Sequence, residues 1–143
     1  MAEFSRAEVE AAWRRRIALQ DADDWQWFGD TFTEDAVYIE HHWGTFVGRD
    51  KILAWLLPAM EKCQGWTYPT DWVNIDGNRV LHRWQNRLPG RRPDGTYYEF
   101  PGITVMVYAG SGRFSLQEDV YNPISAQKVI EEWQAAQPGR TGR

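Results

Sequence analysis

Two segments with strand-like alternation carry side chains that could move a proton. In the first, Ala36–Glu40, successive side chains point to opposite faces, so Val37 and Ile39 share one face. Tyr38 and Glu40 share the other face, and they project into the interior if the aliphatic pair covers the outside. A carboxyl group enclosed by aromatic rings has a raised pKa, which suits it to act as an acid or a base near neutral pH. Glu40 is therefore a candidate proton carrier.

The second segment is Arg79–Leu88, in which arginines recur on one face. These are Arg79, Arg83 and Arg87. Because their charges favour solvent, the opposite face, with His82, Trp84 and Asn86, is expected to point inward. A histidine near a carboxyl group is held in one tautomer and can pass a proton to or from it. His82 is therefore a second candidate, and Trp84 and Asn86 are expected to shape the pocket around it.

The composition also favours a pocket. The chain of 143 residues contains nine Trp, six Tyr and six Phe, and 43% of its residues are hydrophobic. Indole rings are hard to bury completely, whereas pockets for small apolar molecules are commonly lined by aromatic side chains. The aromatic residues therefore predict a cavity for a flat apolar ligand. The alternative is a large aromatic core combined with an aromatic interface between subunits.

Charge and cysteine content disfavour several classes of partner. The net charge of −4 argues against a nucleic-acid partner. The longest apolar run, Ile52–Met60, is too short to span a bilayer, so no membrane partner is expected. The N-terminal region lacks the apolar stretch of a signal peptide, and the single cysteine, Cys63, excludes internal disulfides. These features predict a cytoplasmic location.

The order of elements indicates an α+β protein. Helices are expected over Ser5–Asp21, Trp25–Phe32, from Asp50 onward and after Ser125. Strands are expected over Trp66–Ile75, Arg79–Leu88, Tyr97–Ala109 and Arg113–Tyr121. Pro58 should kink or end the third helix, and Arg14–Arg16 are interpreted as a solvated helix face. Helices followed by antiparallel strands predict a curved sheet packed on helices, in one domain over 1–137 with a flexible tail over 138–143.

The segment His41–Trp43, directly after the first strand, allows two interpretations. Glu40, His41 and His82 could in principle hold a metal ion as a facial triad. Adjacent side chains on an extended segment point in opposite directions, however, and the sequence has only three histidines. We therefore expect no metal, and a loop at the pocket rim with Trp43 at the entrance.

Three motifs resemble a known superfamily. The stretches F-T-E-D-A-V-Y at 32–38, G-T-F-V-G-R-D-K-I at 44–52 and Y-A-G-S-G-R-F-S-L-Q-E-D-V-Y at 108–121 are similar to the nuclear-transport-factor-2-like superfamily. Within it, the chain resembles the SnoaL-like and ketosteroid-isomerase-like branch. The resemblance implies a cone, with a strongly curved, mixed or antiparallel sheet wrapped around the N-terminal helices and an internal apolar pocket. Members include isomerases, dehydratases, epoxide hydrolases, polyketide cyclases, and binding or scaffold proteins, so the fold does not determine the reaction.

The resemblance also implies positions for site residues. Glu40 occupies the place of the isomerase's general base, at the end of the first strand. Arg16 stands where the isomerase has its oxyanion-hole tyrosine, and Thr104 where it has a protonated carboxylic acid, so two of these three positions differ. The face of the last strand with Asp119 and Tyr121 is expected to be the concave one. SnoaL-type cyclases use an acidic residue of this region as the base.

These arguments predict an Asp119–His82 couple that faces Glu40 across the pocket. Asp119 would be the base, His82 its partner or the acid, and Glu40 a second acid or base. The substrate-binding residues would be Tyr38, Trp43, Trp84, Asn86, Thr104 and Tyr121. A simpler alternative is that Asp119 and His82 pair only to satisfy buried polar groups.

The predicted reaction is proton transfer next to a carbonyl group, without a cofactor. It would isomerise, cyclise or dehydrate a small polyketide-, terpenoid- or steroid-like molecule. The protein would be a homodimer joined through the outer face of the sheet. Two other functions stay open at this point: a protein that binds a hydrophobic small molecule without changing it, and a dimeric scaffold module.

Overall fold

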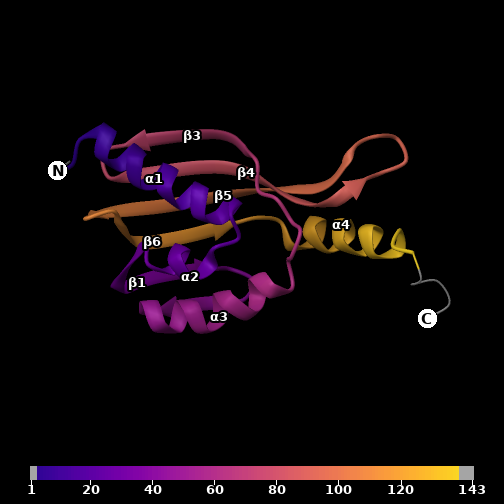
Figure 1. Cartoon of the computed structure of the whole chain (residues 1–143), viewed down its shortest axis with the longest axis horizontal. Helices are drawn as coiled ribbons and strands as arrows, with labels where there is room; N and C mark the ends of the chain where they lie inside the picture. The colour runs from indigo at the N-terminus through magenta and orange to yellow at the C-terminus, as the bar shows by residue number, and fades with distance from the viewer. Residues whose placement is uncertain (1–2, 139–143) are drawn as a thin grey trace.

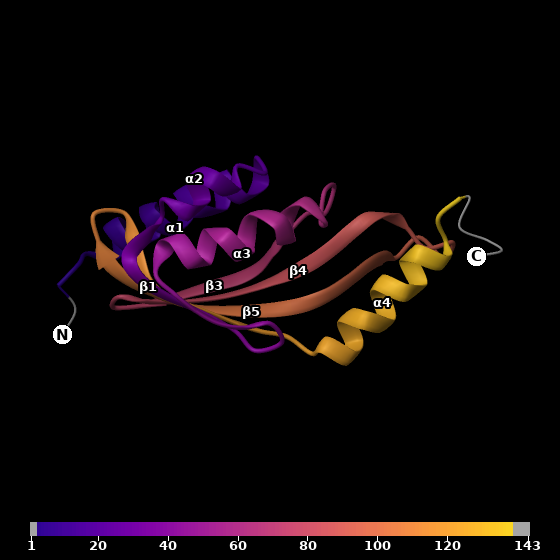
Figure 2. The same cartoon turned by 90° about the horizontal axis from the view of Figure 1, so that it is seen from below.

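A bent, unclosed six-stranded sheet carries three helices on one face and a fourth helix at its far end (Figures 1 and 2). The computed structural model describes residues 3–138. The helices are α1 (Arg6–Asp21), α2 (Trp25–Gly29), α3 (Arg49–Glu61) and α4 (Pro123–Ala135). The strands are β1 (Phe32–Glu40), β2 (Gly44–Val47), β3 (Thr70–Asp76), β4 (Arg79–Arg91), β5 (Tyr97–Gly110) and β6 (Arg113–Val120). Except for Pro138, the predicted tail lies outside the described residues.

The sheet is mixed, because one of its strand pairs is parallel. The order is β2-β1-β6-β5-β4-β3, and every neighbouring pair is antiparallel except β1 and β6. The parallel pair brings the first strand beside the last. Figure 2 shows α1, α2 and α3 on the same side of the sheet, which is the concave side. The predicted α+β class and curved sheet are confirmed.

Helix α1 begins as the sequence predicts. The Ser5 hydroxyl accepts a hydrogen bond from the backbone N–H of Glu8 at 3.1 Å and so satisfies one of the free donors of the first turn. Val9 and Trp13, on one stripe of the helix, are buried against Val80 and other concave side chains of the sheet. This packing fixes the orientation of α1 and therefore determines which of its side chains face the interior.

Several element boundaries differ from the predictions. The strand expected over Trp66–Ile75 begins at Thr70 as β3, because only Thr67 of the preceding residues pairs, in an isolated bridge with Arg87. Helix α2 ends at Gly29, and β1 begins at Phe32, because Phe32 pairs with Phe114 of β6 across a long sequence separation. The predicted loop after β1 contains strand β2, which forms an antiparallel hairpin with β1. Helix α3 continues through Pro58 to Glu61, since proline removes only one backbone donor and the buried stripe of the helix holds it in place.

Helix α4 closes the far end of the sheet, beside the β4–β5 hairpin (Figure 1). Asn122 caps it by accepting hydrogen bonds from the N–H groups of Ile124 and Ser125, so the cap lies three residues before the predicted one. Ala126 packs there with Leu88 and Phe100. Within residues 3–138 there is no helix of the length and apolar character that crossing a membrane requires. The predicted location stays a prediction.

Candidate functional site

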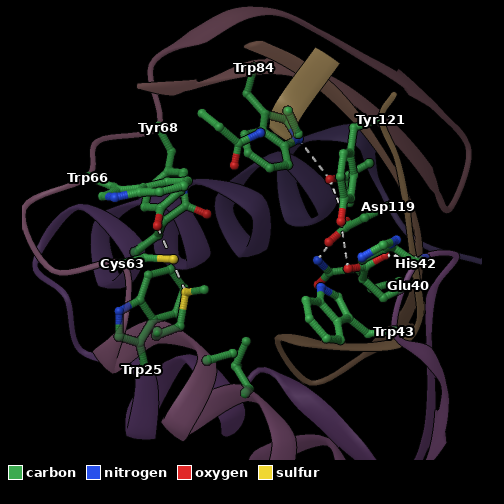
Figure 3. A pocket seen from close by; sticks show the side chains of 18 of the residues that line it. Trp25, Glu40, His42, Trp43, Cys63, Trp66, Tyr68, Trp84, Asp119 and Tyr121 are labelled. Atoms are coloured by element: carbon green, nitrogen blue, oxygen red, sulfur yellow. Dashed lines mark hydrogen bonds between the residues drawn. The ribbon is translucent and has the colours of Figure 1, made fainter. Parts of the chain in front are cut away.

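A cavity of about 800 Å³ lies between the concave face of the sheet and the helices. Figure 3 shows two unlike walls around it. One wall gathers aromatic rings and sulfur, from Trp25, Cys63, Trp66 and Tyr68. The facing wall carries the acids and hydroxyls. The volume falls within the range of pockets that enclose small organic ligands.

All nine site residues predicted from the sequence line this cavity. They are Tyr38, Glu40, Trp43, His82, Trp84, Asn86, Thr104, Asp119 and Tyr121. They come from β1, β4, β5, from β6 and its end, and from the turn after β1. On β1 the burial of Tyr38 and Glu40 alternates with that of half-buried neighbours, as the two-residue period requires. On β4 His82 and Asn86 are buried, whereas Trp84 between them is half-buried and still lines the cavity. The predicted inward faces of these strands are therefore confirmed.

Asp119 is the centre of a buried hydrogen-bond network. Its Oδ1 accepts from the Thr104 hydroxyl at 2.8 Å and from Gln117 Nε2 at 3.0 Å. Its Oδ2 accepts from the Tyr38 hydroxyl. Thr104 Oγ1 in turn accepts from Trp84 Nε1 at 2.8 Å. The network fixes the orientation of the carboxyl group at the wall of the cavity.

Glu40 lies beside Asp119, because the two residues are register partners on the parallel pair β1 and β6. Glu40 Oε2 accepts from the Tyr121 hydroxyl at 3.0 Å, and its Oε1 accepts from the backbone N–H of His42 at 2.8 Å. Each tyrosine donates to the carboxyl group of the other strand: Tyr38 on β1 donates to Asp119 on β6, and Tyr121, just after β6, donates to Glu40 on β1. Glu40 is 5% exposed and Asp119 8% exposed, so both carboxyl groups are removed from bulk water.

Burial sets the protonation of this wall. Desolvation raises the pKa of Asp119 above its usual range, although bonds from Tyr38, Gln117 and Thr104 and the charge of Arg16 act in the opposite direction. Burial and the neighbouring Asp119 also raise the pKa of Tyr38, so its hydroxyl stays protonated and donates. Burial, followed by the nearby Glu40, raises the pKa of Tyr121 in the same way.

The interpretation of Arg16 as part of a solvated helix face is wrong, whereas the resemblance sets it at the place of the isomerase's oxyanion-hole tyrosine. The sequence pattern assigns it to a solvated face, yet it is only 2% exposed and lines the cavity. Its guanidinium donates to Gln117 Oε1, and its charge lies over the ring of Phe28 at 4.3 Å. Burial lowers its pKa to about 10, which leaves it charged at neutral pH. The missed signal is its position three residues after Trp13, on the buried stripe of α1.

Gln117 is a further site residue, absent from the predicted set although it shares the inward face of β6 with Asp119. Its amide oxygen accepts from Arg16 while its amide nitrogen donates to Asp119. Gln117 therefore joins a buried cation to a buried carboxyl group through one side chain. Strand alternation could have identified it.

The predicted Asp119–His82 couple is not formed within residues 3–138. His82 Nε2 is hydrogen-bonded to Thr70 Oγ1 at 2.8 Å, and the His82 ring packs edge-on against Trp13 with ring centres 5.2 Å apart. Burial, with a contribution from Arg16, lowers the His82 pKa to about 4, so the ring is neutral near pH 7. The couple fails because Thr104, opposite His82 on β5, lies between β4 and β6 and bonds Asp119 itself.

The segment after β1 separates the residues of the conceivable metal triad. His41 points outward, where its Nε2 pairs with Glu118 at 2.6 Å, while Glu40 and His82 face the cavity. In the described part of the chain, no group of three His, Cys, Asp or Glu side chains could hold a metal ion. Trp43 is 64% exposed and lines the cavity, which fits its predicted place at the entrance.

Comparisons with known proteins agree with this architecture. A family model described as a SnoaL-like domain matches residues 12–115. A search of curated proteins gives no match. Among solved structures, a protein named as a SnoaL-like polyketide cyclase from Shewanella denitrificans is 16% identical, with a TM-score of 0.70 over 90% of this chain and 99% of that one.

Two further solved structures share the fold. An LEH-like epoxide hydrolase from M. tuberculosis is 16% identical, with a TM-score of 0.69 over 91% of this chain and 94% of its own. An NTF2-like protein from Burkholderia thailandensis is 14% identical, with a TM-score of 0.69 over 85% of this chain and 96% of its own. At these identities the likeness concerns the fold alone. Because the family model spans most of the chain, the protein belongs to the SnoaL-like family, with the NTF2-like fold.

Proposed function

We propose that this protein is a cofactor-independent enzyme that transfers protons on a small, largely apolar carbonyl compound of polyketide, terpenoid or steroid type. The observation that carries the proposal is the Asp119 carboxyl group, fixed by three donors at the wall of a largely apolar cavity. Burial makes this group a stronger base when it is ionised than a carboxylate in water. The cyclase and epoxide hydrolase names of the structural relatives fit acid–base chemistry of this kind.

In the proposed step, the Asp119 carboxylate takes a proton from the carbon next to the carbonyl group. The electrons of the broken C–H bond form the C=C bond of an enolate, and the carbonyl oxygen takes the negative charge. When the enolate is conjugated with a second C=C bond, return of the proton from Asp119 to the far carbon of that system isomerises the molecule. Attack of the enolate carbon on a second carbonyl group forms a ring, and the resulting alkoxide takes the proton from Asp119 or Glu40. A β-hydroxyl group that takes this proton leaves as water, and the molecule is dehydrated.

Glu40 is the second acid or base in this proposal, because it lies next to Asp119 on the same wall. Both groups therefore approach a flat molecule from one face. Tyr121 holds Glu40 in place, and its hydroxyl stays protonated. His82 is neutral and bonded to Thr70, so it would serve as a polar contact for the substrate and not as the partner of Asp119.

Hydrogen exchange at carbon tests the proposal with ketones that need not be the natural substrate. Flat aromatic and alicyclic ketones are incubated with the protein in D₂O, and deuterium next to the carbonyl group is measured by mass spectrometry. We expect exchange that Asp119→Asn slows by about 10² to 10⁴, the usual contribution of a positioned base. Asp76→Asn, at the exposed end of β3 and outside the cavity, is the matched control and should not change the rate. Equal exchange by the wild type and Asp119→Asn would remove Asp119 from the mechanism.

A binding protein is the second candidate function. It is favoured by one observation: three donors already satisfy Asp119, as they would in a purely structural network. A binder would show saturable ligand binding with no deuterium incorporation into any bound ketone. The same experiment therefore separates the two functions.

The proposed assembly is a homodimer joined through the convex face of the sheet. Register places aliphatic residues side by side there: Leu116 of β6 lies between Val37 of β1 and Val107 of β5. The next row sets Val105 of β5 against Leu81 of β4. Helices α1, α2 and α3 lie on the opposite side and leave this apolar row uncovered (Figure 2). A second copy would bury it with matching chemistry.

A further inference from the structure

Two polar side chains of the cavity, Tyr68 and Asn86, are short of hydrogen-bond partners. The Tyr68 hydroxyl donates to Met60 Sδ at 4.0 Å, and a thioether sulfur is a weak acceptor. Asn86 Nδ2 donates to the backbone oxygen of Phe100 at 3.5 Å, beyond the usual N–H···O distance of about 2.9 to 3.0 Å. Both residues line the cavity, so both have hydrogen-bonding capacity left for a ligand.

The side-chain oxygen of Asn86 is the clearest unused acceptor. It accepts no hydrogen bond within residues 3–138, because the one bond of this side chain comes from Nδ2. In the same part of the chain, the side-chain atoms that are both unpaired and fully enclosed are Trp13 Nε1 and Gln20 Nε2. Asn86 Oδ1 is not one of these, so it is unpaired and still accessible. Asn86 as a whole is only 9% exposed and lines the cavity, which is therefore where a partner would reach it.

Strand pairing brings Tyr68 and Asn86 side by side. They lie between two pairs of residues joined by backbone hydrogen bonds, Thr67 with Arg87 and Pro69 with Gln85. Tyr68 and Asn86 therefore oppose each other as the intervening pair of an antiparallel ladder, and their side chains point to the same face. Opposed residues of this kind have Cβ atoms about 4.5 to 5.5 Å apart. We call these two residues the Tyr68–Asn86 pair.

The Tyr68–Asn86 pair is remote from the proposed base. Figure 3 shows Tyr68 on the aromatic wall and Asp119 on the wall that faces it. Along the sheet, Asn86 lies opposite Phe100 of β5. Asp119 lies opposite Thr104, four residues further along the same strand. Four residues extend about 13 Å along a strand, so only an elongated molecule reaches both places.

The two side chains match a hydroxyl group. Burial raises the pKa of Tyr68, so its hydroxyl stays protonated and can donate. Asn86 Oδ1 can only accept, whereas a hydroxyl group both donates and accepts. A methyl group in the same place would leave both side chains without a partner, which carries a desolvation cost.

We propose that the Tyr68–Asn86 pair binds a hydroxyl group at the end of the ligand remote from the carbon that loses its proton. This hydroxyl group would accept from Tyr68 and donate to Asn86 Oδ1. The inference rests on the proposed function for the position of the reacting carbon, and it adds the substrate class: an elongated, flat ketone with a hydroxyl group, such as a phenol, at its far end. The pair makes and breaks no covalent bond, so binding alone tests it.

Ketones that differ only in the remote group test the selection. 6-Hydroxy-1-tetralone and 6-methyl-1-tetralone have nearly equal shape, and 4-(p-hydroxyphenyl)cyclohexanone and 4-(p-tolyl)cyclohexanone form a longer pair. Equilibrium dialysis gives the dissociation constant of each compound. In at least one of the two pairs, we expect the wild type to bind the hydroxy compound about fivefold or more tightly than the methyl compound, as one recovered hydrogen bond implies.

Two variants assign the preference to the Tyr68–Asn86 pair. Tyr68→Phe removes only the hydroxyl, so it should reduce the affinity ratio towards one and leave the affinity for the methyl compound unchanged. Asn86→Leu keeps a side chain of similar size and should also reduce the ratio. Tyr97→Phe, which loses a hydroxyl that is bonded to Arg91 outside the cavity, is the matched control and should keep the wild-type ratio.

Unfolding measurements distinguish a ligand-binding hydroxyl from a structural one. Without ligand, Tyr68→Phe should keep the urea midpoint of the wild type, because the hydroxyl has only a weak acceptor in the folded chain. With the hydroxy compound present, the midpoint of the wild type should rise more than that of the variant. A large loss of stability in ligand-free Tyr68→Phe would show that this hydroxyl has a structural role and would overturn the inference.

The remaining outcomes separate this inference from the proposed function. Equal affinities within both pairs of ketones would show that water alone serves Tyr68 and Asn86, and would overturn the inference. No saturable binding of any of the four compounds, or a preference that survives both variants, would also overturn it. A preference for the hydroxy compound with no deuterium exchange would support the Tyr68–Asn86 pair and remove the proposed chemistry. Exchange that depends on Asp119, combined with no such preference, would do the reverse.

Discussion

Replacement of Asp119 by asparagine should change the pH dependence of stability in a defined direction. Because burial raises the pKa of Asp119 from 3.8, there is a pH range in which the folded state holds this proton and the unfolded state does not. In that range, a rise in pH removes stability from the wild type. The contribution of protonated Asp119 to the free energy of unfolding is thus fully present below pH 3.8. It is lost as the pH rises through the pKa that Asp119 has in the folded state. Asparagine does not titrate, so the variant lacks this loss.

The size of the effect follows from the number of protons involved. One group that titrates differently in the two states changes the free energy of unfolding by at most about 1.4 kcal/mol per pH unit. Above pH 3.8 the free energy of unfolding of the variant should therefore rise relative to that of the wild type, by at most this amount per pH unit. Above the pKa of Asp119 in the folded state, the difference between the two free energies becomes constant. Asparagine preserves the shape of the side chain, and its amide oxygen can still accept from Thr104 and Gln117.

Urea denaturation of both proteins between about pH 4 and about pH 8, at fixed ionic strength, measures this difference. His82 titrates in both proteins, so its effect cancels in the difference between their free energies of unfolding. A difference that does not vary with pH would refute the reasoning. A variant that loses stability relative to the wild type as the pH rises would show that the donors and Arg16 outweigh burial and hold Asp119 ionised.

Three further predictions concern other parts of the molecule. Because burial lowers the His82 pKa from 6.5 to about 4, the wild type should lose about 3 kcal/mol of stability as the pH falls through this range, and His82→Gln should abolish that loss in the same urea assay. Gly102→Ala would place a methyl group 3.0 Å from the Trp84 ring, so it should lower the free energy of unfolding in urea denaturation by about 1 to 3 kcal/mol; an unchanged midpoint would contradict the close packing. Leu81→Lys should convert the proposed dimer to a monomer by light scattering, whereas a dimer of unchanged mass would exclude the convex face as the interface.

Local patterns in the sequence predict much of the site. Two-residue alternation on the first and fourth strands gives the correct inward faces for Glu40 and His82, because one face of each strand is buried. The resemblance to known proteins adds Asp119 and Tyr121 on the concave side of the last strand. The first two predictions need only the alternation of residues along one strand, and the last two need only the sequence motif at 108–121.

The remaining features depend on tertiary structure. Pairing of Phe32 with Phe114 lengthens the first strand, and no short window of sequence contains that information. The sequence pattern places Arg16 on the surface because arginine is rarely buried, although its place on the stripe of Trp13 indicates the interior. The partner of His82 could not be predicted, because it depends on which neighbouring strand places a hydroxyl group next to the ring.

The parallel pairing of β1 and β6 has a consequence for the newly made chain. Tyr38 and the Asp119 that it bonds are 81 residues apart, so the acidic wall cannot exist until the last strand has left the ribosome and entered the sheet. A chain that ends before β6 carries Glu40 but not Asp119, so it has no enclosed carboxyl pair. Ligand binding at that wall therefore requires a completely folded chain. A chain without β6 should show no binding there, even if its other helices and strands have formed.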